Sequence, residues 1–518
     1  NGEIYKFVEL AEELKSKGHV FKTHSDTEVI LYAWREWGER CLEKFRGMFA
    51  FALYDRDQQK LFLARDRLGI KPLFFAILPE QLLIFGSELK ALKQHPQLPN
   101  RIDPFAIEEY FALGYVPEPK TIYSGVSKLP PGHSLLITRG KKVPSPRPYW
   151  DLTFAPVPVE NEQVLLEELV QRMREAVEIR LVAEVPLGAF LSGGVDSSAI
   201  VAMMATLQNK PVNTCAIGFD LERFDETEYA RRVADRYRTS HSEHTVQSND
   251  FDLLDTLARL YDEPYADSSA IPTYRVCELA KKRVTVALSG DGGDESFAGY
   301  RRYRWHINEE QLRSRIPLGL RRTLFGALGR WYPKADWAPR VLRAKSTFLA
   351  LARTSVDAYM QTVSHTTEEQ RSRLFSVSLK RELQGYRAIE IFKWHAQNAG
   401  TEDPLSLIQY LDTKTYLAGD ILTKVDRASM AHSLEVRVPF LDHKFLEWAA
   451  TIPSHYKLKG QEGKSVLKKA LETYLPHDVL YRPKMGFAVP LAAWFRGPLR
   501  QRVRMLLTGS NFVESGLF

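Results

Sequence analysis

The sequence predicts two domains of different fold class: an N-terminal α+β domain with layered antiparallel sheets, and a C-terminal α/β domain with a parallel sheet. In residues 1–150, short apolar runs are separated by short turns, a pattern typical of hairpins. From residue 163, strand-like runs alternate with helical patterns, which indicates a parallel sheet. Prolines gather between the two regions, so we place a linker at 151–162 and the second domain at 163–518.

The predicted elements of the first domain are short. Helices are expected at 7–17, at 26–37 with Ser25 as N-cap, and at 89–93. The expected strands form two hairpin pairs, namely 48–54 with 60–64, and 73–77 with 82–85.

The predicted elements of the second domain alternate in type. Helices are expected at 165–181, 199–207 and 226–236. Strands are expected at 185–191, 211–219 and 284–288. Residues 301–400 have little strand signal and are expected to form a helical extension.

The stretch LSGGVDSS lies between a predicted strand and a predicted helix. Its backbone N–H groups, hydroxyls and helix dipole suit a phosphate chain, and we expect contacts from Leu191, Ser192, Gly193, Gly194, Asp196, Ser197 and Ser198. Asp196 would repel phosphate unless a cation lies between them, so it implies Mg²⁺. The alternative is a plain strand-to-helix turn with serine caps. The spacing of a Walker loop is absent.

A second glycine-rich stretch, LSGDGGDE, follows the strand predicted at 284–288. Its three glycines favour a backbone cradle, and its acids favour a metal–phosphate complex. Asp196 and Asp294 together could hold Mg²⁺ against a pyrophosphate leaving group. The alternative is an acidic turn exposed to solvent.

Three further segments carry charged or polar side chains whose role the local sequence leaves open. Lys464 precedes a helix predicted at 466–474 and could neutralise a phosphate, or be an ordinary exposed lysine. Lys424, Asp426 and Arg427 fit a helix with local i,i+3 ion pairs. The groups Asn1-Gly2-Glu3 and Ser25-Asp26 could cap helices or bind an α-amino acid.

Composition excludes several classes of protein. The net charge is +7, but the arginines at 301–304, 313–330 and 496–504 have helical spacing, and we expect solvated helix faces rather than nucleic-acid binding. No apolar stretch approaches the ~20 residues that cross a bilayer, so no membrane span is expected. The three cysteines are far apart, which favours a reducing, cytoplasmic location.

Taken together, these residues resemble the glutamine-dependent asparagine synthetases of the bacterial type. Ten motifs appear in family order: NGEIY, SDTEVI, GMFAFALYD, RDRLGIKPL, SELKAL, LPPGH, LSGGVDSS, LSGDGGDE, EVRVPFLD and GKSVLKKAL. The resemblance implies an N-terminal-nucleophile glutaminase, of the class II glutamine amidotransferases, followed by a synthetase of the ATP pyrophosphatase fold. It implies that ammonia from glutamine passes through an internal tunnel and displaces AMP from β-aspartyl-AMP.

The resemblance also implies roles for single residues. Asn1, Gly2, Glu3 and Asp26 would bind glutamine, and the stretch 191–198 with Ser289 and Gly290 would bind ATP. Asp196 and Asp294 would hold Mg²⁺, and Lys464 would neutralise pyrophosphate. Asp291 would be the base, in place of the glutamate of LSGEGSDE in relatives. Asp267 and Ser268 would lie near the acceptor, aspartate. A homodimer is one possible assembly.

The family's nucleophile is a cysteine at the start of the mature protein, whose α-amino group serves as base. Asn1 is not such a residue, so we expect the N-terminal domain to be truncated at its start in this sequence, with the nucleophile upstream. Cys41 is expected to pack beneath the helix at 26–37. Two other functions remain open: amide synthesis on another carboxylate acceptor, and a binding or regulatory protein without catalysis.

Overall fold

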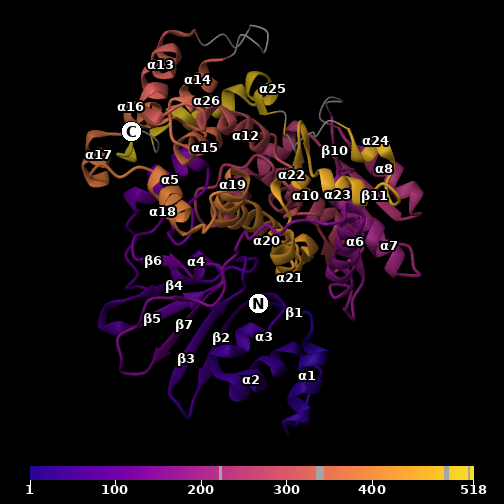
Figure 1. The fold of residues 1–518 in the computed structure, drawn as a ribbon. Helices are drawn as coiled ribbons and strands as arrows, with labels where there is room; N and C mark the ends of the chain where they lie inside the picture. The colour runs from indigo at the N-terminus through magenta and orange to yellow at the C-terminus, as the bar shows by residue number, and fades with distance from the viewer. Residues whose placement is uncertain (221–224, 334–343, 483–488, 490, 511–513) are drawn as a thin grey trace.

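The computed structural model describes residues 1–220, 225–333, 344–482, 489, 491–510 and 514–518. Figure 1 shows the N-terminal residues, in indigo and violet, gathered on one side of the molecule beneath the later helices. Among the helices of the described ranges, none has the length and apolar character needed to cross a bilayer.

The N-terminal region contains two antiparallel sheets. The larger has the order β1-β2-β3-β7-β8, and the smaller has the order β5-β4-β6. Their strands are β1 (Gly2–Ile4), β2 (Gly47–Asp55), β3 (Lys60–Arg65), β4 (Phe74–Ile77), β5 (Leu83–Gly86), β6 (Val126–Lys128), β7 (His133–Thr138) and β8 (Arg147–Pro148). Both predicted hairpin pairs are confirmed, β2 with β3 and β4 with β5.

Helices cover both outer faces of these sheets. α1 (Phe7–Ser16), α2 (Asp26–Trp37) and α3 (Cys41–Lys44) share one core with β2 and β3, and Cys41 is buried in it beside Ala33, as predicted. The side chain of Ser25 accepts the Thr27 N–H at 3.1 Å and caps α2. A second core joins the two sheets. Beyond β4 lie α4 (Leu89–Leu92) and α5 (Pro104–Leu113), which complete a helix–sheet–sheet–helix arrangement.

The C-terminal region is built on a five-stranded sheet with the order β11-β10-β9-β12-β13. All its neighbouring strands are parallel, which confirms the predicted sheet type. Its strands are β9 (Leu187–Phe190), β10 (Asn213–Phe219), β11 (Ser240–Val246), β12 (Val286–Leu288) and β13 (Glu435–Arg437). The edge strands β11 and β13 were not predicted, because β11 is largely polar and β13 has only three residues.

Helices lie on both faces of this sheet. One face packs on α6 (Glu162–Glu178), α7 (Val195–Leu207) and α8 (Thr227–Arg236). The other packs on α9 (Leu254–Tyr261), α10 (Ala270–Lys281) and α20 (Thr423–Met430). The chain therefore leaves β9 on one face, winds outward to β11, and returns to β12 on the other face. The carboxyl ends of β9 and β12 thus form the switch point where such sheets bind ligands.

The predicted helical extension is confirmed for the described part of 301–400. It contains α12 (Arg301–Arg313), α13 (Leu318–Trp331), α14 (Lys345–Leu351), α15 (Ser355–Val363), α16 (Glu368–Leu374), α17 (Val377–Leu383) and α18 (Ile389–Asn398). The chain continues through α19 (Pro404–Asp412), a π-helix (Thr413–Leu422) and α20. The remaining α-helices and strands of the described residues are α11 (Gly293–Phe297), α21 (His443–Ala449), α22 (Ser454–Lys457), β14 (Leu458–Lys459), β15 (Glu462–Gly463), α23 (Ser465–Ala470), α24 (His477–Leu480), α25 (Leu491–Arg496) and α26 (Arg500–Thr508).

The prediction that the arginines of 301–330 lie on solvated helix faces is wrong for three of them. Arg302 binds Asp412 with an N–O distance of 2.6 Å and lies over the Tyr300 ring. Arg313 is buried and pairs with Glu309 and Glu310. Arg321 is also buried and donates to the carbonyl groups of residues 351 and 353. A guanidinium group can be buried when most of its donors are paired with carboxylates or carbonyl oxygens.

Candidate active site

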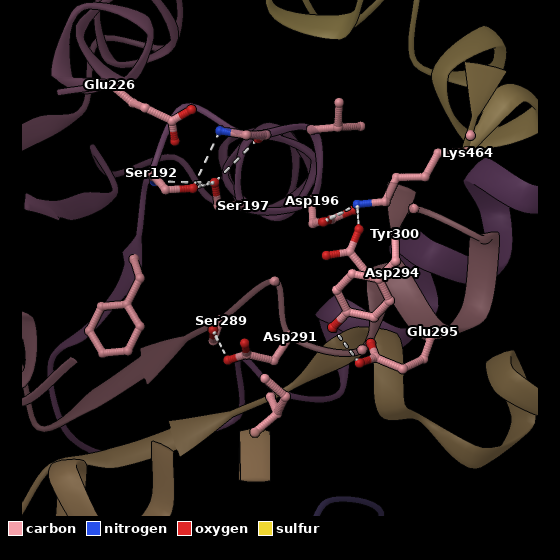
Figure 2. A pocket seen from close by; sticks show the side chains of 18 of the residues that line it. Ser192, Asp196, Ser197, Glu226, Ser289, Asp291, Asp294, Glu295, Tyr300 and Lys464 are labelled. Atoms are coloured by element: carbon pink, nitrogen blue, oxygen red, sulfur yellow. Dashed lines mark hydrogen bonds and ion pairs between the residues drawn. The ribbon is translucent and has the colours of Figure 1, made fainter. Parts of the chain in front are cut away.

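A cavity of about 1150 Å³ opens at the carboxyl ends of β9 and β12. The loops that follow these two strands form its centre, and residues of α10, α12, α20 and α23 contribute to its wall. Figure 2 shows the two loops facing each other across it. The cavity therefore occupies the switch point of the parallel sheet.

The loop 191–198 presents most of its predicted residues to the cavity. Leu191, Ser192, Gly194, Asp196 and Ser197 line it, whereas Gly193 and Ser198 are not among the described lining residues. The hydroxyl oxygens of Ser192 and Ser197 lie 3.0 Å apart, and the Ser192 N–H donates to the Ser197 hydroxyl. α7 begins at Val195, four residues before the predicted start, so Asp196 and Ser197 lie in its first turn. The positive end of this helix dipole therefore points into the cavity.

Gly193 supports the loop from behind. Its φ is +71°, and a Cβ there would lie 2.6 Å from the Ala230 backbone nitrogen. A side chain would strain the backbone and collide with α8. Its carbonyl oxygen accepts a hydrogen bond from Arg482 at 3.0 Å.

The second loop touches the first directly. Ser289, Gly290, Asp291 and Asp294 all line the cavity. A Cβ at Gly290 would lie 2.7 Å from the Ser197 backbone nitrogen, so only glycine lets the two loops approach this closely.

Asp196, Asp294 and Lys464 converge from three distant parts of the chain. Lys464 pairs with Asp196, and its Nζ lies 2.6 Å from Asp294 Oδ1. Figure 2 shows both carboxylates directed at the lysine. Although burial opposes the charge, the two carboxylates raise the pKa of Lys464 above its ordinary value. Lys464 is buried, so it is not the exposed lysine of the alternative interpretation.

The two carboxylates offer hard oxygen ligands to a magnesium ion. A Cβ at Gly293 would lie 2.5 Å from Asp196 Oδ1, and one at Gly299 would lie 1.9 Å from Asp294 Oδ1. Glycine at both positions leaves room for these oxygens and, beside Gly299, for the Lys464 side chain. Within the described ranges no three His, Cys, Asp or Glu side chains group as a metal site. Mg²⁺ commonly binds one or two carboxylates and takes its other ligands from phosphate and water, so the pair Asp196 and Asp294 is chemically suited to it.

Asp291 lies at the inner side of the second loop. The Ser289 hydroxyl donates to Asp291 Oδ2 at 2.6 Å. Burial raises the pKa of Asp291, while this hydrogen bond and the charge of Lys424 oppose the rise. A carboxyl group with a raised pKa can accept a proton more readily than an exposed one.

Lys424 was missed as a residue of the site. Its Nζ donates to Asp267 at 2.7 Å and to the Ser269 hydroxyl at 2.8 Å, and all three residues line the cavity. Ser268 is not among the described lining residues. The predicted local i,i+3 pairing is wrong here, because Lys424 pairs with Asp267 across the fold. The one sequence signal for this pairing is that a lysine in a buried helix needs an acidic partner, and Asp267 and Asp291 are acids in predicted site segments.

Asn1, Gly2, Glu3 and Asp26 lie together in the N-terminal region. The first three are at β1, and Asp26 Oδ2 accepts the N–H of Ile4 at 3.1 Å. Gly2 has a φ of +111°, and a Cβ there would lie 2.0 Å from the Met48 carbonyl oxygen. Burial and the nearby Asp26 raise the pKa of Glu3 to about 7.

Comparison with known proteins agrees with both halves of this architecture. Residues 168–518 match the family described as asparagine synthase, and residues 1–150 match the glutamine amidotransferase domain. The chain is 35% identical to asparagine synthetase [glutamine-hydrolyzing] 1 of Bacillus subtilis, covering 99% of this chain and 78% of the relative.

Two further relatives match over similar lengths. A putative asparagine synthetase [glutamine-hydrolyzing] of Mycobacterium tuberculosis is 36% identical, covering 96% of this chain and 75% of the relative. Amidase chyE of Penicillium rubens is 28% identical, covering 99% of this chain and 80% of the relative. The chain therefore belongs to the asparagine synthase family, among its glutamine-hydrolysing members.

Proposed function

We propose that this protein makes asparagine from aspartate, using ATP to activate the side-chain carboxylate and glutamine as the source of ammonia. The observation that carries the proposal is the convergence of Asp196, Asp294 and Lys464 on one cavity at the switch point. The products are asparagine, AMP and pyrophosphate, with glutamate from the glutamine. In this scheme the carboxylate oxygen attacks the α-phosphorus of ATP, and pyrophosphate leaves.

The loop 191–198, with Ser289 and Gly290, would hold the phosphate chain through backbone N–H groups and hydroxyls. Asp196 and Asp294 would hold Mg²⁺, which neutralises phosphate charge when bound. Lys464 lies between these carboxylates and would stabilise the negative charge that builds up on the departing pyrophosphate. Its raised pKa keeps this lysine charged at neutral pH.

The second step joins ammonia to the activated carbonyl and releases AMP. Asp291 would take the proton that the attacking nitrogen loses, and burial raises its pKa toward the range useful for that task. Asp267 and Ser268 remain our candidates for acceptor binding, with Lys424 and Ser269 added by their contacts. An acceptor with an ammonium group would find carboxylates here, and one with a second carboxylate would find Lys424.

We divide the protein into a glutaminase domain at 1–150, a linker at 151–162 and a synthetase domain of the ATP pyrophosphatase type at 163–518. Asn1, Gly2, Glu3 and Asp26 would bind glutamine. The ionised Glu3 carboxylate would pair with its α-ammonium group. All three cysteines are free and buried, which suits the reducing cytoplasm as the location.

Release of pyrophosphate from Mg²⁺-ATP tests the proposal when the intact protein is offered a panel of carboxylic acids with ammonium. We expect aspartate to give the highest rate, with equal amounts of AMP and asparagine. A second candidate is amide formation on another carboxylate, since a relative that matches 99% of this chain is named an amidase. Stimulation by a different acid, with none by aspartate, would replace our proposal with that one.

Asp196→Asn is the site-specific variant for the same assay. It removes a charge from the proposed metal site, so we expect pyrophosphate release to fall about 100-fold or more while glutamine hydrolysis persists. Asp235→Asn, on the exposed side of α8, is the matched control and should have no effect. Equal activity of the two variants would remove Asp196 from the site.

A further inference from the structure

The outer face of α13 carries an apolar row that the described residues leave exposed. Leu320, Leu324, Leu328 and Trp331 recur three or four residues apart and therefore share one side of the helix. We call these four residues the α13 stripe. They are between 40% and 88% exposed, and Trp331 is the most exposed of the four. Single exposed leucines are ordinary on protein surfaces, whereas a continuous apolar row is typical of a binding surface.

The opposite face of α13 is packed on α14. The rings of Phe325 and Phe348 stack with their centroids 6.2 Å apart. A Cβ at Gly329 would lie 2.7 Å from Leu349 Cδ2, so the two helices are in close contact there. Arg321 is buried on this side and donates to two carbonyl oxygens at the end of α14. The helix is therefore held by its inner face, and the α13 stripe is turned outward.

The region around α13 carries the positive charge of the whole chain. Residues 311–356 contain ten lysines and arginines and one aspartate, which is a formal charge of +9, whereas the whole chain carries +7. The rest of the protein is therefore slightly acidic in net charge. No acidic residue occurs in the described parts of this region, 311–333 and 344–356.

Several of these charges are available to a partner. Arg315, Arg330 and Arg353 are exposed, and none of them forms an ion pair with another described residue. Arg315 and Arg330 lie at the two ends of α13, so they stand at either end of the α13 stripe. An apolar row on a basic helix is typical of helices that lie in the headgroup layer of a membrane.

The charges decide among the possible partners of the α13 stripe. A second copy of the chain would bring the same arginines face to face, with no acid from the described region to pair them. A nucleic acid would neutralise the arginines but leave the leucines in water. An anionic lipid surface suits both, because acyl chains take up the apolar side chains and headgroup phosphates bind the guanidinium groups.

We propose that the outer face of α13 binds the surface of anionic membranes, with the α13 stripe entering the edge of the apolar layer. The basic residues around it would contact the lipid phosphates. α12 leads directly into α13 and contributes Arg304 and Trp305 to the wall of the cavity. A membrane that binds α13 would therefore also hold this cavity near its surface.

Sedimentation of the intact protein with lipid vesicles tests the proposal. We expect binding to vesicles of phosphatidylcholine and phosphatidylglycerol in equal parts, and at least about tenfold weaker binding to pure phosphatidylcholine. Raising the salt concentration from about 0.05 M to about 0.5 M should weaken the binding, because salt screens the charges. If the intact protein does not bind the anionic vesicles at low salt, the proposal is wrong.

Two double variants test the two components of the surface. Leu324→Gln with Leu328→Gln removes apolar contact, and Arg315→Gln with Arg330→Gln removes charge. Each pair should lower the affinity for anionic vesicles at least about tenfold. All four side chains are exposed, so both variants should fold and release pyrophosphate at the normal rate with soluble substrates.

The matched control variants lie at the other end of the molecule in Figure 1, in the N-terminal region. Val8→Gln with Leu31→Gln changes two residues of α1 and α2 that are about half exposed, like the leucines of the α13 stripe. Lys141→Gln with Lys142→Gln removes two exposed charges after β7. Both controls should bind anionic vesicles as the unaltered protein does. Equal losses in the controls and in the α13 variants would overturn the proposal.

Tryptophan fluorescence reports insertion rather than attraction alone. Trp331 should move from water into the interfacial layer, so the emission should shift to the blue when anionic vesicles are added. Trp331→Phe should still bind but should lose most of this shift, although eight other tryptophans remain. The same shift in both proteins would show that Trp331 does not enter the lipid, which contradicts the proposal.

The state of association separates the lipid from a second copy as the occupant. We expect the Leu324→Gln, Leu328→Gln variant to have the same mass in solution as the unaltered protein. A dimer that dissociates in this variant would show that a second copy covers the α13 stripe, and the proposal would be wrong. Vesicle binding requires no catalysis, so these results are independent of the proposed function.

Discussion

At the scale of single residues, the charges that matter are paired across long stretches of chain. Lys464 meets Asp196 and Asp294, and Lys424 meets Asp267. The glycine-rich loops could be predicted because strand, turn and helix signals are local. The partners of Lys424 and Arg302 could not, because a sequence shows charge at i,i+3 whether or not the side chains turn inward. A charged side chain that is buried by the fold needs a partner at that place, and this partner can be far away in the sequence.

Lys457 is a buried charge of a different kind. Lys457 is 1% exposed, and its Nζ lies 5.3 Å from the centre of the Phe154 ring. Phe154 belongs to the predicted linker at 151–162. Burial lowers the pKa of Lys457 to about 7, although Asp403 opposes the shift. An unfolded lysine has a pKa of about 10.4, so the unfolded chain binds the extra proton between these values. The contribution of Lys457 to the free energy of unfolding therefore becomes less favourable as the pH falls from about 10 to 7.

We expect Lys457→Met to raise the melting temperature, and to raise it more at pH 6 than at pH 10. The methionine keeps much of the volume and removes the cost of a buried proton, which is fully present below pH 7. Thermal unfolding of both proteins across this pH range measures the difference. Lys459→Met, at an exposed position two residues away, should show no such pH dependence. An equal gain at every pH would contradict the explanation by burial.

At the scale of elements, local signals decided what could be predicted. α2 was predicted with its correct bounds because Ser25 and an amphipathic face mark it locally. The sequence predicts the start of α7 too late, because the polar residues Asp196 and Ser197 resemble a loop although they form the first turn of the helix. β13 has three residues and forms only by pairing with β12, so no local pattern could reveal it.

Gly292 allows the second loop to meet the segment 435–442. It has a φ of +91°, and the space beside it is filled by Leu441. We expect Gly292→Ala to destabilise the protein by about 1–3 kcal/mol through backbone strain, with further loss from the collision. Leu441→Ala in the same chain should relieve the collision but not the strain, so the two effects should be less than additive.

The free energies of unfolding of the two single variants and the double variant measure the interaction between Gly292 and Leu441. Gly326→Ala is the matched control, since it lies inside α13 with nothing within 4 Å of the added carbon. Alanine is favoured over glycine in a helix, so the control should be neutral or stabilising. Full additivity of Gly292→Ala and Leu441→Ala would show that the two residues do not interact.

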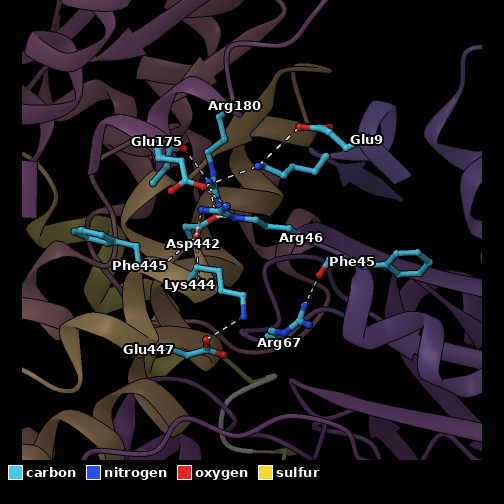
Figure 3. Close-up of polar contacts among 12 residues, drawn as sticks. Glu9, Phe45, Arg46, Arg67, Glu175, Arg180, Asp442, Lys444, Phe445 and Glu447 are labelled. Carbon is cyan, nitrogen blue, oxygen red and sulfur yellow. Dashed lines mark hydrogen bonds and ion pairs between the residues drawn. The ribbon is translucent and has the colours of Figure 1, made fainter. Parts of the chain in front are cut away.

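At the scale of the whole molecule, buried ion pairs hold the two regions together. Lys71 binds Asp426 at 3.0 Å and Lys128 binds Glu263 at 2.5 Å, with all four side chains at most 10% exposed. With the Arg46–Asp442 pair (Figure 3), they join residues 1–150 to residues 163–518 at three separate positions. No pattern within either domain could predict these contacts, because each depends on how the two surfaces meet.

Buried ion pairs at this interface lead us to expect that ammonia passes between the two proposed sites without mixing with the solvent. We expect the intact protein, given glutamine labelled with ¹⁵N at its amide and about a tenfold excess of unlabelled ammonium, to place mainly ¹⁵N in the product. Intramolecular delivery gives the glutamine nitrogen a high effective concentration at the activated acceptor. Mass spectrometry of the product amide measures the label.

Lys71→Met removes one buried ion pair and should admit unlabelled ammonia, whereas Arg101→Met, at the exposed edge where Arg101 pairs with Glu382, should not. Product labelled in proportion to the free nitrogen pools in the unaltered protein would show that the ammonia is released to solvent first.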